Sequence, residues 1–204
     1  MPSEVKRVYF GDYLFIVDEN VYEPSEDSFL FAENLKVKET EVVLDMGTGC
    51  GILSILVAKK SHAVVALDVN PYAVQCAREN AKLNNVQNKI FCVQGDLFTP
   101  LSDNAKFDII VFNAPYLPTE ENETSSWIGR AWAGGAAGRQ VIDRFIAEAP
   151  IHLRYTGRIL LMQSTLANVN ETLHRFATYH LKAQVVAERK CSFFETITLI
   201  EAKI

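Results

Sequence analysis

The sequence lacks the features of several protein classes. Its cysteines, at positions 50, 76, 92 and 191, form no Cys-x-x-Cys pair, and its four histidines show no zinc-ligand spacing. No apolar run approaches the roughly 20 residues that span a bilayer. The first residues, MPSEVKRVYFGDYLF, contain no apolar core of a signal peptide. We therefore expect a cytoplasmic protein with reduced thiols, no metal site and no membrane contact.

Basic charge is also scarce. The chain has 20 Lys and Arg against 25 Asp and Glu, a formal net charge of −5. Nucleic-acid binding depends largely on Lys and Arg that neutralise phosphates, so this balance disfavours a nucleic-acid substrate without excluding a local basic groove. The 204 residues, 49% of them hydrophobic, are enough for a core without disulfide or metal. We expect a single domain over 1–204, with an N-terminal hairpin or extension at 1–24 and a core at 25–204.

Apolar runs without alternation recur along the chain and are separated by helical patterns. Such runs are typical of strands that are covered on both faces of a parallel sheet. The runs are Val42–Met46, Ala63–Leu67, Ile90–Val93, Ile109–Phe112 and Ile159–Met162. The last two strand candidates, 183–189 and 195–201, follow each other without room for a helix, which indicates an antiparallel hairpin. The pattern predicts a doubly wound α/β sheet.

Helix signals fill the intervals between these strands. Asn70 is a potential cap before Pro71, and Asn84-Asn85 would end that helix. Two further helices have the apolar stripes Ile142/Phe145/Ile146/Ala149, stopped by Pro150, and Val169/Leu173/Phe176/Ala177, with His174 and His180 on the latter pattern. A hairpin around Gly11-Asp12 is expected in the N-terminal segment, and 114–138 reads as a long functional loop.

A glycine loop follows the first core strand. In VVLDMGTGCGILS, Gly47, Gly49 and Gly51 lie between a strand and a helix, where glycines let the backbone approach a ligand. A dinucleotide fingerprint would require a third glycine at position 52, which is Ile52. The spacing Gly-x-Gly-x-Gly is instead similar to the S-adenosylmethionine loop of Rossmann-like methyltransferases. We read Cys50 within it as a small residue near the ligand, not as a nucleophile.

Three acids follow strands at the ends where ligands bind in parallel sheets. Asp68 ends a strand where a carboxylate accepts ribose hydroxyls, Asp45 would face the amino-acid portion of the donor, and Asp96 would lie near the adenine. Each acid alone is equally compatible with a helix or turn cap. Their joint position predicts a donor site.

The next strand ends in Asn113-Ala114-Pro115-Tyr116. This segment resembles the Asn-Pro-Pro-Tyr signature of methyltransferases that modify planar nitrogens: glutamine amides and the exocyclic amines of adenine and cytosine. An Asn carbonyl and a backbone carbonyl accept the two N–H bonds of such an amine and orient it, while a Tyr ring stacks on its plane. Ala114 departs from the pattern, and we expect a looser loop there. A plain strand-exit turn is the alternative.

Further motifs extend the resemblance in the correct order. They are VYEPSEDSFLF, LDMGTGCGILS, LDVNPYAV, GDLF, FNAPYLP and WAGGAAGRQVIDRF. Together they resemble the HemK-type protein glutamine methyltransferases, in particular the short archaeal and eukaryotic branch that methylates the Gly-Gly-Gln glutamine of peptide-chain release factors. The resemblance implies a class I Rossmann-like fold, with a seven-stranded, mostly parallel sheet whose last strand is antiparallel.

The resemblance also implies the roles of individual residues. The donor S-adenosylmethionine would be held by Ser28, Asp45, Gly47, Gly49, Gly51, Asp68, Asp96, Leu97 and Asn113. Asn113, Pro115 and Tyr116 would form the methyl-transfer site. Ser28 is also compatible with a capping role at a helix start.

Two substrate alternatives stay open: N6-adenine of DNA or RNA, and another protein. Arg130, Arg139 and Arg144 would either line a nucleic-acid groove or form helix-surface pairs. The glycine-rich stretch Trp132–Arg139, with Trp127, would cover a peptide loop or merely form a surface loop. A protein that binds S-adenosylmethionine only for structure is a third class.

A partner is expected as well. The apolar segment 89–94 is strand-like and would lie at the edge of the sheet, where it would pair with another chain or be covered by the protein's own loops. The resemblance implies that a small zinc-binding activator protein adds to this edge, in place of the extra N-terminal domain of bacterial HemK-type enzymes. Phe91 and Val93 are the side chains that we expect to face it.

Overall fold

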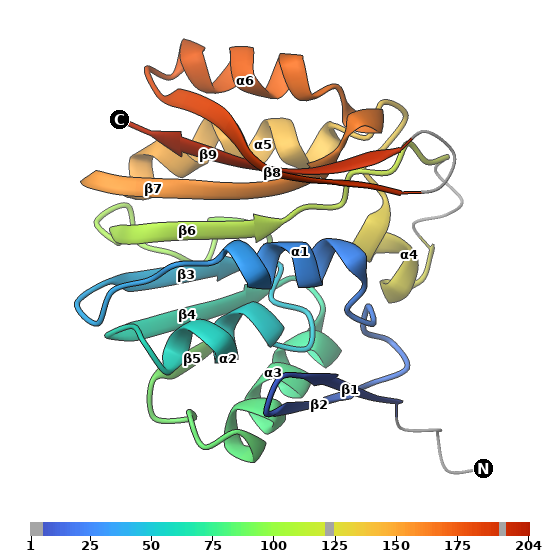
Figure 1. Cartoon of the computed structure of the whole chain (residues 1–204), viewed down its shortest axis with the longest axis vertical. Helices are drawn as coiled ribbons and strands as arrows, with labels where there is room; N and C mark the ends of the chain where they lie inside the picture. Colours follow the sequence, from blue (N-terminus) through green and yellow to red (C-terminus); the bar gives the residue numbers. More distant parts are fainter. Residues whose placement is uncertain (1–5, 121–124, 192–194) are drawn as a thin grey trace. The chain divides into compact units, whose positions relative to one another are not determined.

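The computed structural model describes residues 6–120, 125–191 and 195–204. Seven strands form a sheet in the order β5-β4-β3-β6-β7-β9-β8, and β1 and β2 form a separate two-stranded sheet (Figure 1). The strands are β1 Lys6–Phe10, β2 Tyr13–Val17, β3 Val42–Met46, β4 Ala63–Asp68, β5 Ile90–Gln94, β6 Phe107–Asn113, β7 Leu153–Ser164, β8 Lys182–Lys190 and β9 Thr196–Lys203. The helices are α1 Glu26–Asn34, α2 Ile52–Ala58, α3 Pro71–Leu83, α4 Trp127–Trp132, α5 Gln140–Glu148 and α6 Val169–Thr178, with 3₁₀ turns η2 Ala149–His152 and η3 Thr165–Ala167.

Strand directions confirm the predicted fold class. The pairs β3–β4, β4–β5 and β6–β7 are parallel. The last strand, β9, runs antiparallel to both β7 and β8, so the predicted C-terminal hairpin is present. The chain divides into two compact units, Met1–Pro100 and Leu101–Ile204, which we describe separately. The single domain expected from the sequence stays a prediction.

The first unit is built on the parallel strands β3, β4 and β5. Their apolar runs are covered: Val43, Leu44 and Val64 are completely buried. Helix α3 begins as the sequence predicts, since Asn70 Oδ1 accepts the Tyr72 N–H at 3.0 Å, and Asn84 is its C-cap. Helix α2 contacts both α1 and α3. Because β3 and β4 are neighbouring parallel strands, the loops that follow them lie at the same edge of the sheet.

The N-terminal hairpin is also confirmed. Strands β1 and β2 pair antiparallel around Gly11-Asp12, with Phe10 opposite Tyr13. The hairpin lies against α3 (Figure 1). Phe15 is fully buried, and Phe10 stacks on Phe29 of α1 with ring centroids 5.9 Å apart. The hairpin is therefore part of the apolar core of the first unit.

In the second unit, α5 packs against β6, the strand that precedes it in the sequence. Ile142, Phe145 and Ile146 form the predicted stripe and are fully buried, and Phe145 lies 4.8 Å from Phe112 of β6 between ring centroids. Pro150 does not lie directly after the helix; the chain continues through η2, which contains this proline at a position that needs no N–H donor. Helix α6 contacts β8 and α5.

Three local expectations were wrong. The stretch 114–138 contains helix α4, whose N-cap Ser126 accepts the Gly129 N–H at 3.0 Å. Ala177 was expected in the buried stripe of α6 but is exposed. Thr172 is buried instead, because its hydroxyl hydrogen-bonds Gln163 at 2.6 Å. His180 lies beyond the end of α6 in a left-handed conformation, with φ of 62°. Residues 121–124 of the expected loop lie outside the described residues. The last strand was expected to begin at residue 195, and β9 begins at Thr196.

Within the described residues, no helix has the length and apolar character needed to cross a membrane. Over the same ranges, no group of three or more His, Cys, Asp or Glu side chains is arranged to hold a metal ion.

Candidate active site

The glycine loop joins β3 to α2. Gly47, Gly49 and Gly51 all have positive φ, at 65°, 56° and 86°. A Cβ added at Gly51 would lie 3.1 Å from the backbone and side chain of Ala77, so α3 leaves no room for a side chain there. A Cβ at Gly49 would meet nothing within 4 Å, so this part of the loop borders open space. The loop is thus held on one side and accessible on the other, as a ligand-binding backbone requires.

Asp45 anchors this loop. Its Oδ2 accepts hydrogen bonds from Thr48 Oγ1 at 2.7 Å, Ser54 Oγ at 2.6 Å and Ser54 N at 3.0 Å. Burial raises the pKa of Asp45 to about 6; the Ser54 and Thr48 hydrogen bonds oppose the rise, and the charge of Asp68 adds to it. Thr48 and Ser54 were not singled out from the sequence. Their only sequence signals are that Thr48 lies three residues after Asp45 and that Ser54 lies near the start of a helix.

Asp68 connects β4 to the same loop. Its Oδ2 accepts the Gly49 N–H at 2.9 Å and its Oδ1 accepts the Asn70 N–H at 2.9 Å. Burial raises the pKa of Asp68, while the backbone N–H groups of Asn70 and Gly49 oppose the rise. Asp68 is only 9% exposed, and the Val69 N–H also donates to its carboxylate. A carboxylate offers about four acceptor sites, so capacity remains for a ribose hydroxyl.

The remaining donor candidates lie in the same unit. Leu97 is buried and has a φ of 47°, a strained conformation for a residue with a branched side chain, and Asp96 beside it is exposed. Ser28 is the third residue of α1, whose N-cap is Ser25, so the capping alternative for Ser28 is wrong. Ser28 is buried, and its N–H and hydroxyl both donate to Asp27 Oδ1, at 2.6 and 3.2 Å.

The candidate methyl-acceptor residues lie in the second unit. Asn113 is the last residue of β6, and Ala114, Pro115 and Tyr116 follow directly. Ala114 is buried, and its N–H donates to the Met162 carbonyl of β7 at 3.4 Å. A proline at this position would have no N–H. The departure from the family pattern therefore supplies a long backbone hydrogen bond to the neighbouring strand.

A glycine turn supports the backbone after Tyr116. Leu117 N–H donates to Trp132 O at 3.0 Å, and Gly134 N–H donates back to Leu117 O at 2.9 Å. Gly138, with φ of 69°, lies against the Tyr116 carbonyl so closely that any Cβ would collide with that oxygen. The stretch Trp132–Arg139 is therefore not only a surface loop: its backbone positions the residues that follow Asn113.

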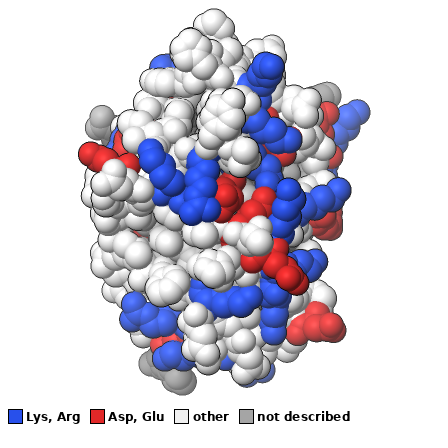
Figure 2. Space-filling model, turned by 90° about the vertical axis from the view of Figure 1, so that its left-hand side faces the viewer, with Lys and Arg blue, Asp and Glu red and all other residues white. Residues whose placement is uncertain are grey.

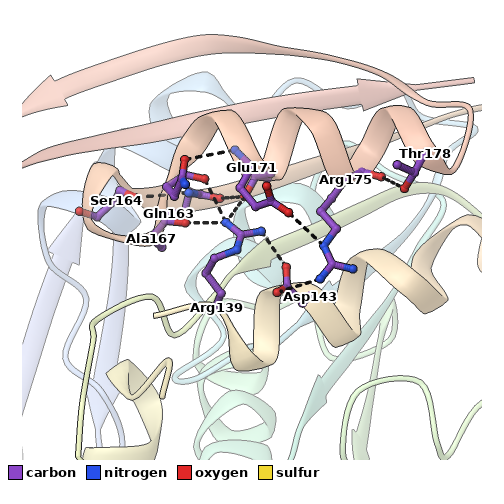
Figure 3. Close-up of polar contacts among 10 residues, drawn as sticks. Arg139, Asp143, Gln163, Ser164, Ala167, Glu171, Arg175 and Thr178 are labelled. Carbon is purple, nitrogen blue, oxygen red and sulfur yellow. Dashed lines mark hydrogen bonds and ion pairs between the residues drawn. The ribbon is translucent and has the colours of Figure 1, made fainter. Parts of the chain in front are cut away.

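Arg139 follows this turn as the N-cap residue of α5, and its side chain contacts η3 and α6 (Figure 3). Its Nη1 donates to the carbonyls of Ala167 and Asn168 and to Thr172 Oγ1, and its Nη2 pairs with Asp143 at 2.7 Å. Arg139 is only 8% exposed. The expectation that it lines a groove or forms a surface pair was wrong, because its partners are backbone carbonyls around η3 as well as a carboxylate.

The other singled-out side chains have plainer surroundings. Arg130 is exposed and lies over the Trp127 ring, 4.8 Å from its centroid, and Arg144 is exposed. Cys50 is 1% exposed, and burial raises the pKa of its thiol, so Cys50 is unsuited to act as a nucleophile. His174 is exposed on α6.

Comparison with known proteins identifies the family of the chain. Residues 21–190 match the family described as Methyltransferase small domain. A protein of Methanocaldococcus jannaschii, provisionally named a protein N5-glutamine methyltransferase, is 42% identical over 88% of this chain and 90% of its own. Methyltransferase HEMK2 of Homo sapiens is 33% identical over 89% of each chain. The release factor glutamine methyltransferase of Aquifex aeolicus is 32% identical over 72% of this chain and 56% of its own.

Solved structures share the fold. In the E. cuniculi Mtq2–Trm112 complex, responsible for the methylation of the eRF1 translation termination factor, one chain superposes with a TM-score of 0.70. It is 27% identical and covers 90% of this chain and 98% of its own. The tRNA m1G37 methyltransferase of M. jannaschii has a TM-score of 0.73 at 21% identity, covering 98% of this chain and 56% of its own, which is a likeness of fold alone.

The sheet order and the family match together define a Rossmann-like methyltransferase that uses S-adenosylmethionine. Within that class, the chain belongs to the HemK-type protein glutamine methyltransferases of the methyltransferase small-domain family.

Proposed function

We propose that this protein transfers a methyl group from S-adenosylmethionine to the side-chain amide nitrogen of the glutamine in the Gly-Gly-Gln motif of a peptide-chain release factor. The observation that carries the proposal is the position of Asn113 at the carboxyl end of β6, followed by Ala114-Pro115-Tyr116. The Tyr116 carbonyl lies directly against Gly138. The relatives named for glutamine methylation support the choice of this planar nitrogen.

The first unit supplies the residues for the donor. We assign the ribose hydroxyls to Asp68, the adenine to Asp96 and Leu97, and the amino-acid portion to Asp45, Gly47 and Ser28. The residues fit such a ligand, since the loop borders open space at Gly49 and the Asp68 carboxylate retains acceptor capacity. When bound, S-adenosylmethionine presents a methyl group on a positively charged sulfur, which makes that carbon electrophilic.

The second unit supplies the residues for the acceptor. The amide nitrogen of glutamine is a weak nucleophile because its lone pair is delocalised. Asn113 Oδ1 and the Ala114 carbonyl would accept its two N–H bonds, and Tyr116 would stack on the amide plane. Pro115 restricts the backbone between them. As the nitrogen–carbon bond forms and the carbon–sulfur bond breaks, the electron pair passes to sulfur and the nitrogen releases one proton to water. The residues lower the barrier by alignment, without a strong base.

A nucleic-acid substrate is the less favoured alternative. On the face shown in Figure 2, Lys and Arg side chains are interspersed with Asp and Glu. In the second unit such charges form ion pairs, among them Arg154–Asp108 at 2.6 Å and Lys203–Glu201 at 2.7 Å. Paired cations gain less from phosphate than free ones, since the existing carboxylate must be displaced.

The direct test is transfer of labelled methyl groups to a purified release factor. Substrates are the factor, its variant with Gln→Ala in the Gly-Gly-Gln motif, an unrelated protein, and single-stranded and duplex DNA and RNA. Label should appear in the factor alone and vanish with the variant. Label in nucleic acid, or undiminished label in the variant, would overturn the proposal. The Asp68→Ala enzyme should lose donor affinity by about tenfold or more, while the matched surface variant Asp108→Ala keeps it.

We further propose that a small zinc-binding activator protein pairs with β5, and that both act in the cytoplasm. Among the described residues, β5 pairs with β4 and begins the strand order, so its other edge has no strand partner there, and Phe91 is 60% exposed. The E. cuniculi relative was solved with a second protein. Zinc in the activator would be measured in the purified complex, where zinc-free complex would remove that part of the proposal.

A further inference from the structure

The N-terminal hairpin is hydrogen-bonded to α3 by two asparagine side chains. Asn80 Oδ1 accepts the Ile16 N–H at 2.9 Å, and Asn80 Nδ2 donates to the Ile16 carbonyl at 2.8 Å. One turn further along the helix, Asn84 makes the same pair of contacts with Leu14, at 3.4 and 2.8 Å. The two amides thus extend the hydrogen bonding of β2 on the edge that does not pair with β1.

Asn80 has two contacts that Asn84 lacks, a 3.6 Å contact from Nδ2 to Cys76 Sγ within the same helix and a bond to the glycine loop. Its second Nδ2 hydrogen bonds the carbonyl of Cys50, inside the glycine loop, at 2.8 Å. Asn80 is 1% exposed, so water does not compete for these bonds. The second amide proton of Asn84 instead bonds the Asn80 carbonyl within the same helix, at 2.9 Å. One side chain therefore ties the hairpin to the loop, and its neighbour ties the hairpin to the helix alone.

A second connection lies at the other end of the segment. Asn70 Nδ2 donates to the Asn20 carbonyl at 2.8 Å, and the Asn70 N–H is held by Asp68. The segment from β2 to Asn20 is therefore linked through Asn80 to the glycine loop and is bonded directly to Asn70, whose N–H donates to Asp68. Neither Asn70 nor Asn80 is among the residues assigned above to contact the methyl donor.

We infer that Asn80 is a positioning residue for the methyl donor, through which the N-terminal hairpin holds the glycine loop in its donor-binding conformation. The Cys50 carbonyl lies between Gly49 and Gly51, two residues with positive φ, and glycine has more backbone freedom than other residues. A buried amide bonded to that carbonyl restricts the loop, so less ordering is needed when the donor binds. The inference rests on the donor site proposed above.

The test compares Asn80→Leu with Asn84→Leu. Both variants remove bonds to the hairpin and should lower the unfolding temperature. Only Asn80→Leu should weaken donor binding, by about tenfold in calorimetry, with a matching rise in KM for the donor. Its kcat at saturating donor should stay within about threefold of wild type, because the loop is ordered once the donor is bound. A purely structural role would change both variants alike and would not separate KM from kcat.

A second variant and a second measurement cover the case in which Asn80→Leu does not fold. Asn80→Asp keeps the acceptor for the Ile16 N–H and removes the N–H donors to the Cys50 and Ile16 carbonyls, and it should weaken binding of the methyl donor as Asn80→Leu does. In the wild-type protein, hydrogen exchange of 13–17 should slow by about fivefold when S-adenosylhomocysteine is added, while 182–190 is unchanged.

Unchanged donor affinity in a folded Asn80 variant, or equal weakening in Asn84→Leu, would overturn the inference, as would unaltered exchange of 13–17. These outcomes differ from a failure of the proposed function. In that case the wild-type protein itself would bind no S-adenosylmethionine, whereas the inference alone fails when wild type binds the donor and the variants bind it equally well.

Discussion

Asp45 combines two requirements in one side chain. It is buried and accepts three hydrogen bonds from Thr48 and Ser54, so it fixes the start of the donor loop. The same burial raises the pKa of Asp45 to about 6. An anion held at this place would attract the ammonium group of the donor, so its ionisation controls affinity near physiological pH.

Donor affinity should therefore fall as pH decreases through about 6. At pH 5 most Asp45 carboxyls are protonated, and the affinity for S-adenosylmethionine should be roughly tenfold lower than at pH 7. Calorimetry across this range measures the effect. Ser54→Ala removes the Oγ hydrogen bond that lowers the pKa of Asp45, so the midpoint should move to higher pH. A midpoint that stays in place would show that another group titrates.

The sign is opposite for folding. The unfolded chain loses the Asp45 proton near 3.8 and the folded chain near 6, so the neutral form stabilises the fold at low pH. This contribution is lost as pH rises through about 6. Affinity and stability therefore change in opposite directions over the same interval.

Asn113 acts at the acceptor end. Asn113→Ala should lower kcat for release-factor methylation by roughly 10–100-fold, because the glutamine amide loses the acceptor that orients it. Donor affinity, measured by calorimetry, should remain close to that of wild type. Methylation at the wild-type rate by a folded Asn113→Ala enzyme would remove the role assigned to this residue.

At the scale of elements, the sequence reveals what depends on local pattern. The apolar runs predict β3, β4, β5 and the central part of β6 and β7, and the caps at Asn70 and Asn84 predict α3. The ends of β7 were missed, because Arg154–Gly157 are mostly polar or small and exposed, and strand pairing alone makes them extended. Helix α4 has six residues including Gly129, too short for a periodic signal.

Contacts between distant segments leave no such signal. Arg139 meets carbonyls at Ala167 and Asn168, and Asn80 meets Ile16, 64 residues away. The acids and glycines of the site were recognised from type and spacing. Their supports, Thr48, Ser54, Asn70 and Asn80, were not, because an Asn or Ser on a helix reads as a cap or a surface residue until its partner is placed.

The link between α5 and η3 gives a stability prediction. Arg139→Met should lower the free energy of unfolding by about 3 kcal/mol, because two carbonyls, Thr172 and Asp143 lose a buried charged donor. Arg175→Met, which also removes an ion pair with Asp143 but from a 41% exposed side chain, should cost about 1 kcal/mol or less. Urea unfolding measures both. Equal costs would mean that the bonds of Arg139 contribute no more than a surface pair.

At the scale of the whole molecule, we expect the outer edge of β5, which has no strand partner among the described residues, to affect behaviour in solution. Phe91 is the exposed apolar residue on that strand, and its neighbour Ile90 is buried. The alternative that Ile90, Phe91 and Val93 all pack under the protein's own loops fails for Phe91, which is 60% exposed. The isolated chain should be poorly soluble or weakly active until the activator is added.

The partner prediction uses one substitution on this strand. Phe91→Lys should abolish co-purification with the activator and its stimulation of release-factor methylation, because an ammonium would be buried in the interface. Tyr155→Lys, at an 84% exposed aromatic of the second unit, is the control and should retain both. Full activity of the isolated, monodisperse wild-type chain, unchanged by the activator, would contradict the prediction.

The two asparagines on α3 also decide which strand edges can recruit another chain. Backbone groups of Leu14 and Ile16 that would otherwise be available on β2 are occupied by side-chain amides. An incoming strand would have to displace both asparagines before it could pair with β2. If the activator pairs with β5 as proposed, the side chains that occupy the β2 edge would direct an incoming strand to β5.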